Sequence, residues 1–344
     1  MLSVLASRLE QAWWRDGDPL SLALAPLSWL YGAAWRVHAQ SFARGWRRRQ
    51  QLPVPVVVVG NLVVGGVGKT PAVIATVRLL RERGYAPGIV SRGWGRSTDA
   101  VQEVEPTSLA ALVGDEPLLL RLRAAAPVVV GRDRPAAAAA LLRKHPDVDV
   151  LVCDDGAQHL ALVRDLAVLV FDERGAGNGR LLPAGPLREP MDKRAPPDSI
   201  VLYNAAAPST RWRGATARRR LAGVVELGPW WKGDAPSIDA LEALRGPRLV
   251  AAAGIAHPER FFSMLEDAGL TIDRCPLPDH HDYETMPWSG ADAAAIVTEK
   301  DAVKLRPERV GITRVWVAAL DFEPEAAYAD ALRRRLPMPR SAAR

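Results

Sequence analysis

A strand that runs into a glycine-rich turn and then into a helix is the feature that most constrains this sequence. Residues 54–59 read Val-Pro-Val-Val-Val-Val, and the chain continues from 60 to 70 as Gly-Asn-Leu-Val-Val-Gly-Gly-Val-Gly-Lys-Thr. Glycines let backbone N–H groups turn inward, and the N-terminus of the following helix adds positive potential. Such a loop suits a bound polyphosphate, so the sequence predicts a nucleotide-binding α/β fold.

The side chains of this loop have individual expected roles. Lys69 is expected to reach the β- and γ-phosphates, and the Thr70 hydroxyl to bind Mg²⁺, so ATP and Mg²⁺ are the expected cofactors. Val63 stands where the full phosphate-loop pattern has glycine, and Gly65 with Gly66 is expected to supply the flexibility instead. The alternative is that the glycines only form a tight connection between the strand and the helix and bind no phosphate. The expected nucleotide-binding residues are Val63, Val64, Gly65, Gly66, Val67, Gly68, Lys69 and Thr70.

Two aspartates follow another apolar strand. Asp154 and Asp155 come directly after the run 148–153. Carboxylates at the end of a buried strand are costly unless a cation neutralises them, and a phosphate loop needs such a group to hold Mg²⁺. We therefore expect both to be metal ligands, although aspartates also mark solvated turns.

Two further acidic segments leave alternatives open. Asp115 opens the apolar run that follows Gly114, where an aspartate is also a common helix N-cap. Residues 278–283 read Pro-Asp-His-His-Asp-Tyr. Such a cluster suits metal binding and a His–Asp pair tuned for proton transfer equally well, and the residues alone do not decide between them.

The order of apolar runs predicts a doubly wound, mostly parallel α/β sheet with a second, smaller α/β domain. Strands that are apolar on both faces alternate with amphipathic stretches along most of the chain after residue 51. The expected parts are a membrane-associating segment 1–50, a core 51–205 that holds the phosphate loop, a linker 206–219 and a smaller domain 220–344. Expected strands outside the loop are 88–91, 127–130, 148–153, 166–171, 199–203, 248–253, 295–298 and 314–318, and expected helices are 70–84 and 257–269.

The N-terminal segment resembles an interfacial membrane anchor. Residues 19–35 carry no charge, and between Asp18 and Glu82 every charged residue is basic. Aromatic rings and cations of this kind settle at the headgroups of anionic lipid. We expect residues 13–49 to meet a membrane surface, whereas a buried helix that covers the domain is the alternative. The aromatic residues concerned are Trp13, Trp14, Trp29, Tyr31, Trp35 and Trp46.

The composition excludes several other classes. The 344 residues are 48% apolar and 24% charged, which leaves little room for long disorder. Two cysteines cannot build a disulfide framework, so a reducing compartment is expected. The net charge of +6 is concentrated near the N-terminus, and no nucleic-acid partner and no obligate protein partner is expected.

Taken together, the motifs resemble the tetraacyldisaccharide 4′-kinase family, the membrane-associated lipid A kinases of Gram-negative bacteria. The resemblance covers most of the chain, with its motifs in family order. They are GNLVVGGVGKTP at 60–71, SRGWGR at 91–96, GDEPLLL at 114–120, CDDGAQH at 153–159, NGRLLPAGPLREP at 178–190, PDHHDY at 278–283 and TEKDAVKL at 298–305.

The resemblance implies transfer of the ATP γ-phosphoryl group to the 4′-hydroxyl of a tetraacylated disaccharide 1-phosphate, at the cytoplasmic face of the inner membrane. Asp115 would accept the hydroxyl proton and His280 would orient it, with His281 as the alternative partner. Glu116 would add to the metal ligands, and the choice between Arg132 and Arg134 as the phosphate-facing arginine stays open. The cleft, to which the smaller domain would contribute, would be lined by Gln158, His159, Arg188 and Glu189.

A membrane-associated nucleotide switch of the partitioning or metal-chaperone type is the main alternative function. Its phosphate loops also read GGVGKT, but usually with a lysine where this chain has Val64. A guanine-reading Asn-Lys-x-Asp motif is not found, because residues 298–301 read Thr-Glu-Lys-Asp. A nucleic-acid binder using the arginines at 44–49 is the weaker alternative.

Overall fold

The computed structural model describes residues 2–289 and 294–339, which form two compact units. Unit 1 comprises Met1–Arg92, Asp133–Arg218 and Glu323–Arg344, and unit 2 comprises Gly93–Arg132 and Arg219–Phe322. The units differ from the parts expected from the sequence. Residues 93–132, expected in the core, belong to unit 2, and the chain after 322 returns to unit 1, because both segments pack against elements far away in the sequence.

Unit 1 is built on a parallel sheet whose strands, apart from β8, are buried along their whole length. The strand order is β7-β6-β1-β5-β2, and the first residues of β8 pair in parallel with β7. Strands buried on both faces explain the unbroken apolar runs in the sequence. Their bounds are β1 Val56–Gly60, β2 Pro87–Ser91, β5 Val150–Asp154, β6 Leu166–Asp172, β7 Ser199–Asn204 and β8 Ala215–Glu226.

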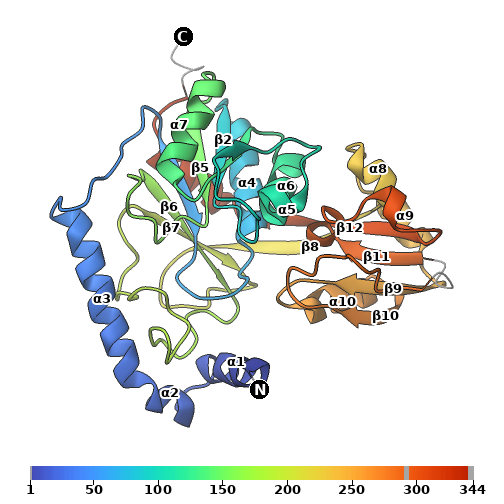
Figure 1. The fold of residues 1–344 in the computed structure, drawn as a ribbon, viewed down its shortest axis with the longest axis horizontal. Helices are drawn as coiled ribbons and strands as arrows, with labels where there is room; N and C mark the ends of the chain where they lie inside the picture. Colours follow the sequence, from blue (N-terminus) through green and yellow to red (C-terminus); the bar gives the residue numbers. More distant parts are fainter. Residues whose placement is uncertain (1, 290–293, 340–344) are drawn as a thin grey trace. The chain divides into compact units, whose positions relative to one another are not determined.

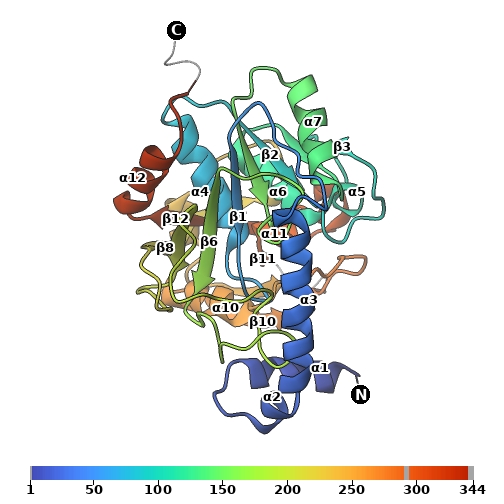
Figure 2. The ribbon, with the colours of Figure 1, turned by 90° about the vertical axis from the view of Figure 1, so that its left-hand side faces the viewer.

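Three helices cover this sheet (Figure 2): α4 (Lys69–Arg81), α7 (Arg134–Lys144) and α12 (Ala326–Arg335). The C-terminal helix α12 lies beside α4, and the buried hydroxyls of Tyr328 and Thr76 are 2.6 Å apart. This contact ties the returning C-terminal chain to the helix that follows the glycine loop.

The N-terminal segment folds as three helices of unit 1: α1 (Leu2–Trp13), α2 (Pro19–Ala23) and α3 (Ala25–Ala43). Figure 1 shows α3 as one long helix that starts at α2 and runs alongside unit 1. No helix in the described part of the chain is long and apolar enough to cross a membrane.

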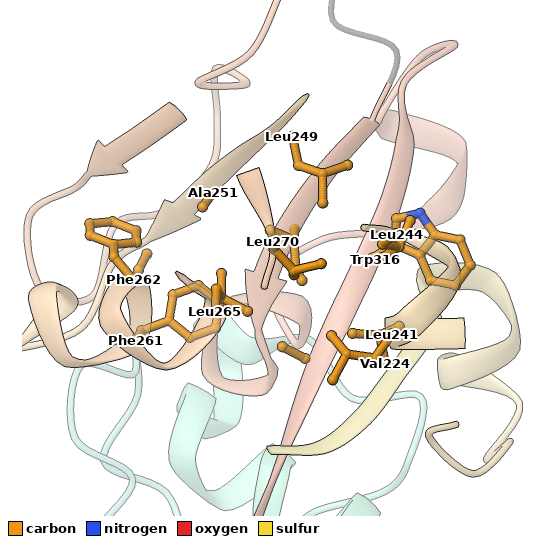
Figure 3. Close-up of a cluster of buried hydrophobic side chains, with 13 residues drawn as sticks. Val224, Leu241, Leu244, Leu249, Ala251, Phe261, Phe262, Leu265, Leu270 and Trp316 are labelled. Atoms are coloured by element: carbon orange, nitrogen blue, oxygen red, sulfur yellow. The ribbon is translucent and has the colours of Figure 1, made fainter. Parts of the chain in front are cut away.

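Unit 2 contains four parallel strands in the order β10-β9-β11-β12, with β8 beside β12. Helix α10 (Pro258–Asp267) directs Phe261, Phe262 and Leu265 into the core of this unit, where Trp316 of β12 also lies (Figure 3). The strands are β9 Arg248–Ala253, β10 Thr271–Pro276, β11 Ala294–Thr298 and β12 Arg314–Pro324.

Smaller elements complete unit 2. Strands β3 (Gln102–Glu103) and β4 (Val128–Val130) pair in antiparallel fashion, and α6 (Asp115–Ala124) packs against α11 (Glu299–Ala302). The others are α5 Ala110–Val113, α8 Leu227–Trp231, α9 Ile238–Ala243 and the 3₁₀ turn Pro307–Arg309.

The expected mostly parallel α/β fold is confirmed. Each expected strand has a counterpart that differs by only a few residues at its ends, except that β12 extends to Pro324. The stretch 206–219, expected as a linker, is instead partly strand, because β8 starts at Ala215 and the boundary between the units falls inside it. Three consecutive arginines, at 218–220, interrupt β8, so this strand is only partly buried and lacks an unbroken apolar run.

Candidate active site

The glycine loop of unit 1 joins β1 to α4 with a conformation that depends on glycine. Gly65 and Gly68 have φ angles of 99° and 91°, a region that L side chains rarely adopt. The first atoms that a Cβ on Gly65 would meet belong to the Arg174 guanidinium, at 3.8 Å. Helix α4 begins at Lys69, so the loop ends on a helix N-terminus, where an anion is favoured.

Val63, which replaces the usual glycine, lies in an extended segment rather than in a turn. It is fully buried and forms an antiparallel bridge with Leu187. The Val64 N–H donates to the Pro186 carbonyl at 2.9 Å, and the Arg188 N–H donates to the Leu62 carbonyl at 2.7 Å. Glycine is not required there, because the φ angle is not positive and the partner segment holds the backbone extended.

Asp154 and Asp155 lie at the carboxyl edge of the same sheet, because β5 pairs with β1. Asp154 is buried and accepts a hydrogen bond from the Ser91 hydroxyl at 3.0 Å. Asp155, at a φ of 49°, has its Oδ1 atom 3.7 Å from Lys69 Nζ and 3.4 Å from Arg188 Nη1. The loop lysine, one aspartate and Arg188 thus form a single cluster.

Of the two candidate arginines, Arg134 lies at this cluster. It is buried at the start of α7 and donates to the Asp155 carbonyl at 2.7 Å. Burial lowers the pKa of its guanidinium. Arg132 belongs to unit 2, where it is exposed and pairs with Asp99.

The remaining cleft residues expected in unit 1 lie on the segments that flank the loop. Gln158 Nε2 donates to the Asn61 carbonyl and to Glu189 Oε1, both at 2.9 Å. Burial raises the pKa of the Glu189 carboxyl, although the Gln158 bond opposes this shift. His159 is half-buried, and burial together with the charge of Arg134 lowers its pKa, which favours the neutral imidazole.

Unit 2 brings Asp115 and His280 together across 165 residues of sequence. His280 Nδ1 lies 2.8 Å from Asp115 Oδ2. Gly114 is the N-cap of α6 and Asp115 is the first helical residue, so the N-cap interpretation of Asp115 is wrong. His281 has a different task, since its Nδ1 accepts the Tyr283 N–H at 3.1 Å. The histidine that pairs with Asp115 is therefore His280.

This pair favours an ionised carboxylate. Burial raises the pKa of Asp115, but the hydrogen bond with His280 and the charge of Lys300 outweigh it, so the pKa lies below its ordinary value. The hydrogen bond to the Asp115 carboxylate raises the pKa of His280, while burial and the charge of Lys300 oppose the rise. A carboxylate of this kind can accept a proton at neutral pH.

The expected metal ligands fall into both units. Thr70, Asp154 and Asp155 belong to unit 1, at the carboxyl edge of β1 and β5, and offer the oxygen donors that Mg²⁺ prefers. Glu116 belongs to unit 2, where its Oε1 atom lies 3.4 Å from Lys300 Nζ. Within residues 2–289 and 294–339 no group of three or more His, Cys, Asp or Glu side chains is arranged to hold a metal ion by itself.

Two basic side chains near these groups were not identified from the sequence. Lys300 contacts the Asp115–His280 pair, and Arg174 donates from Nη2 to the Gly66 carbonyl of the loop at 3.3 Å. The motif at 298–305 was the available signal for Lys300. Arg174 follows β6 without a distinctive pattern, so no motif marks it.

Comparison with known proteins gives one consistent family. The family model described as tetraacyldisaccharide-1-P 4′-kinase (LpxK) matches residues 20–337. The chain is 53% identical over 334 residues to the tetraacyldisaccharide 4′-kinase of Methylibium petroleiphilum, covering 95% of this chain and 93% of the relative. It is 52% identical over 338 residues to that of Leptothrix cholodnii, covering 97% of each.

A solved structure agrees with these sequences. The fold aligns with LpxK from Aquifex aeolicus, crystallised as an "apo" form in complex with ATP, with a TM-score of 0.75 and 25% sequence identity. The alignment covers 92% of this chain and all of that chain.

Proposed function

The chain belongs to the tetraacyldisaccharide-1-P 4′-kinase family, and from this premise we propose that it moves the γ-phosphoryl group of ATP to the 4′-hydroxyl of a tetraacyldisaccharide 1-phosphate. The sugar oxygen forms a bond to the γ-phosphorus as the bridge to the β-phosphate breaks, and ADP and a proton leave. Family membership over nearly the whole chain favours this kinase over a nucleotide switch.

The glycine loop, whose Lys69 faces Asp155, is the observation that carries the proposal. We assign residues 63–70 to the triphosphate, with Lys69 on the β- and γ-phosphates. In the structure Lys69 Nζ lies 3.7 Å from Asp155 Oδ1, which is longer than a hydrogen bond, so the ammonium keeps donors for a ligand. Phosphate oxygens would then replace a weak contact with stronger ones.

Thr70, Asp154 and Asp155 would hold Mg²⁺, and Glu116, which pairs with Lys300, is left out of this set. A buried carboxylate at the end of β5 and a hydroxyl on the first turn of α4 are the expected donors for this ion. A bound Mg²⁺ would supply positive charge that offsets the negative charge developing on the phosphate oxygens.

Asp115 would accept the proton of the sugar hydroxyl, and His280 would hold that carboxylate in place. Support comes from the 2.8 Å hydrogen bond and from the lowered pKa of Asp115. The carboxylate touches the reacting oxygen, whereas His280 acts through it. Most of the acceleration would come from charge neutralisation and alignment of the phosphate with the hydroxyl.

Arg188 would neutralise charge at the same loop, since its guanidinium already lies 3.4 Å from Asp155. Gln158 and Glu189 would hold the loop backbone through the Asn61 carbonyl. For His159 the assignment is a neutral hydrogen-bonding group toward substrate, which its lowered pKa supports.

We further assign α3 to a membrane surface of anionic lipid on the cytoplasmic side. Its buried residues are the small Ala25, Ser28 and Gly32, with Phe42 in the last turn. Leu30 and Val37, one helical heptad apart, are exposed to 68% and 63%, the reverse of a normal surface helix. Large apolar side chains exposed to water mark an interaction surface. Because the proposed substrate is a lipid, we infer that the partner of this surface is a bilayer.

Five of the six aromatic residues divide into two groups, and the sixth, Trp35, is half-buried beside His38. Trp29 and Trp46 are exposed to 73% and 67%, as an interfacial role requires. Trp13 instead donates to the Pro183 carbonyl, Tyr31 donates to the Arg188 carbonyl, and Trp14 lies under the Arg174 guanidinium. These three rings dock the N-terminal helices on unit 1, so we limit the lipid-facing set to the exposed residues of α3, Trp46 and the arginines that follow α3.

The test of the function is a product analysis. The full chain is incubated with ATP, Mg²⁺ and tetraacyldisaccharide 1-phosphate, and the lipid is recovered and examined by mass spectrometry and ³¹P NMR. We expect one added phosphate, at the 4′ position. ATP hydrolysis without a phosphorylated lipid would favour the switch and refute the kinase.

A further inference from the structure

The motif Thr298-Glu299-Lys300-Asp301 lies at His280 in unit 2, although none of the roles above uses it. Lys300 Nζ is 3.3 Å from His280 Nε2, 3.3 Å from Asp279 Oδ1 and 3.4 Å from Glu116 Oε1. The lysine side chain is only 19% exposed. It therefore meets the imidazole at the nitrogen opposite the one that faces Asp115.

The charge of Lys300 determines what this contact is. Burial lowers the pKa of the ammonium, but Glu116, Asp115 and Asp279 outweigh it and raise that pKa above its ordinary value. A charged ammonium only donates. The contact with His280 Nε2 is thus a hydrogen bond only when Nε2 carries a lone pair, which leaves the ring proton on Nδ1, facing Asp115.

The second half of the motif holds the backbone of His280. Asp301 is fully buried and accepts the Gly254 N–H at 3.1 and 3.2 Å and the Thr298 hydroxyl at 2.7 Å. The Gly254 carbonyl in turn accepts the His280 N–H at 3.1 Å. His280 has a φ of 62°, which costs about 1 kcal/mol or more in a non-glycine residue, so an anchored backbone is needed to keep it there.

The other charged groups around the ring are paired elsewhere. Glu299 of α11 pairs with Arg123 of α6, and Lys304 donates to Asp301 at 3.2 Å. Asp279, in the loop of His280 itself, lies 3.9 Å from Nε2, beyond hydrogen-bond distance. Within the described part of unit 2, the cation in contact with the imidazole is Lys300.

We propose that Lys300 is a positioning residue of the kinase: by donating to Nε2 it selects the Nδ1–H tautomer of His280 and so holds Asp115 as a carboxylate. One oxygen of Asp115 accepts the His280 proton, and the other is left for the sugar hydroxyl. His280 is then an orienting donor that does not take the proton from Asp115. This inference rests on the proposed role of Asp115 as the base.

The ¹⁵N resonances of the His280 ring show directly, in the unmodified protein, which nitrogen carries the proton. The chain has six histidines, so ¹⁵N-histidine labelling with His280→Asn for assignment isolates one imidazole. Spectra are recorded on the basic side of the ring's titration. We expect Nε2 to resonate as a proton-free nitrogen and Nδ1 as N–H. A proton on Nε2 with a bare Nδ1 would overturn the proposal.

Kinetics of Lys300→Met, Lys300→Arg and Arg123→Met supply the second arm. We expect Lys300→Met to lower kcat about tenfold or more, with KM for ATP unchanged, because only the orientation of the base is lost. Lys300→Arg keeps a cationic donor and recovers part of kcat. Arg123→Met removes an ion pair from the neighbouring Glu299 and keeps wild-type kcat. Equal kcat in Lys300→Met and Arg123→Met, or a rise in KM for ATP alone, would contradict the proposal.

Asp115→Asn in the same assay tests the assignment of Asp115 as the base separately from the role of Lys300. If Asp115→Asn keeps its kcat, the assignment of the base fails and the Lys300 proposal fails with it. If Asp115→Asn loses kcat while Lys300→Met does not, the base assignment stands and only the role of Lys300 is refuted.

Discussion

Replacing Trp29 and Leu30 by serine should weaken the binding of the protein to lipid vesicles without affecting its fold. The two side chains are exposed to 73% and 68%, so the folded protein loses little when they are removed. Full burial of a large apolar side chain stabilises by about 1.5–3 kcal/mol, so about two thirds of that, roughly 1–2 kcal/mol each, is available to a membrane. The pair then accounts for about 3 kcal/mol, or about 100-fold in partitioning.

The assay is co-sedimentation of the full chain with vesicles of phosphatidylglycerol and of phosphatidylcholine. Ile312→Ser is the matched control, because Ile312 is 88% exposed and belongs to unit 2. We expect wild type and Ile312→Ser to bind alike and to bind the anionic vesicles more tightly. Binding should weaken as salt is added, since each arginine near the membrane surface adds about 1 kcal/mol to the binding free energy. If Trp29→Ser/Leu30→Ser sediments like the control, α3 is not the membrane surface.

Four other outcomes are expected. Lys69→Ala should lower kcat about 100- to 1000-fold, since it removes a donor from the transferring phosphate. Near-normal turnover would show that the loop is not part of the active site. Asp115→Asn should lower kcat about 100-fold or more with KM for ATP unchanged, whereas an effect on KM alone would show that Asp115 is not the base. The interactions that lower the pKa of Asp115 stabilise unit 2 at a pH above the ordinary pKa of 3.8, and this stabilisation is lost as the pH falls through the pKa of the folded protein. The gap in thermal stability between wild type and Asp115→Asn should therefore close on acidification below about pH 4, and a gap that persists at lower pH contradicts this. Phe262→Ala, at a fully buried position, should cost about 3–5 kcal/mol in urea unfolding followed by tryptophan fluorescence, and a cost below about 1 kcal/mol would mean that the unit 2 core is not packed as described.

The sheet of unit 1 could be predicted because its strands are buried on both faces. Each appears in the sequence as an unbroken apolar run, and β5 ends at the two aspartates that were singled out. The loop was recognisable for the same reason, since each of its residue types has a separate physical task. Strand β8 was missed because it is only partly buried and lacks such a run.

The pairing of distant segments could not be predicted. Asp115 and His280 are 165 residues apart, and only the folded chain shows that His280, rather than His281, faces the carboxylate. The assignment of 93–132 to unit 2 is a similar case. Val63 could not be interpreted from the loop alone, because its partner Leu187 lies in a distant motif.

For the aromatic residues of the N-terminal segment, residue type alone does not predict which rings face lipid and which contact the protein. Their residue type predicted headgroup contact for all six, yet Trp13, Trp14 and Tyr31 contact the chain itself. A tryptophan suits a buried polar contact as well as an interface, because one edge donates and the rest is apolar. Only the positions of the carbonyl and guanidinium partners separate the two roles.

The stoichiometry of transfer tests the central claim most directly. With γ-³²P-ATP, Mg²⁺ and the lipid disaccharide, ADP formed and label recovered in the lipid are measured in the same samples. A kinase that aligns the phosphate with a held hydroxyl gives one labelled lipid for each ADP, and little ADP when the lipid is omitted. ADP that accumulates at the same rate without the lipid, with no label in it, would contradict the account.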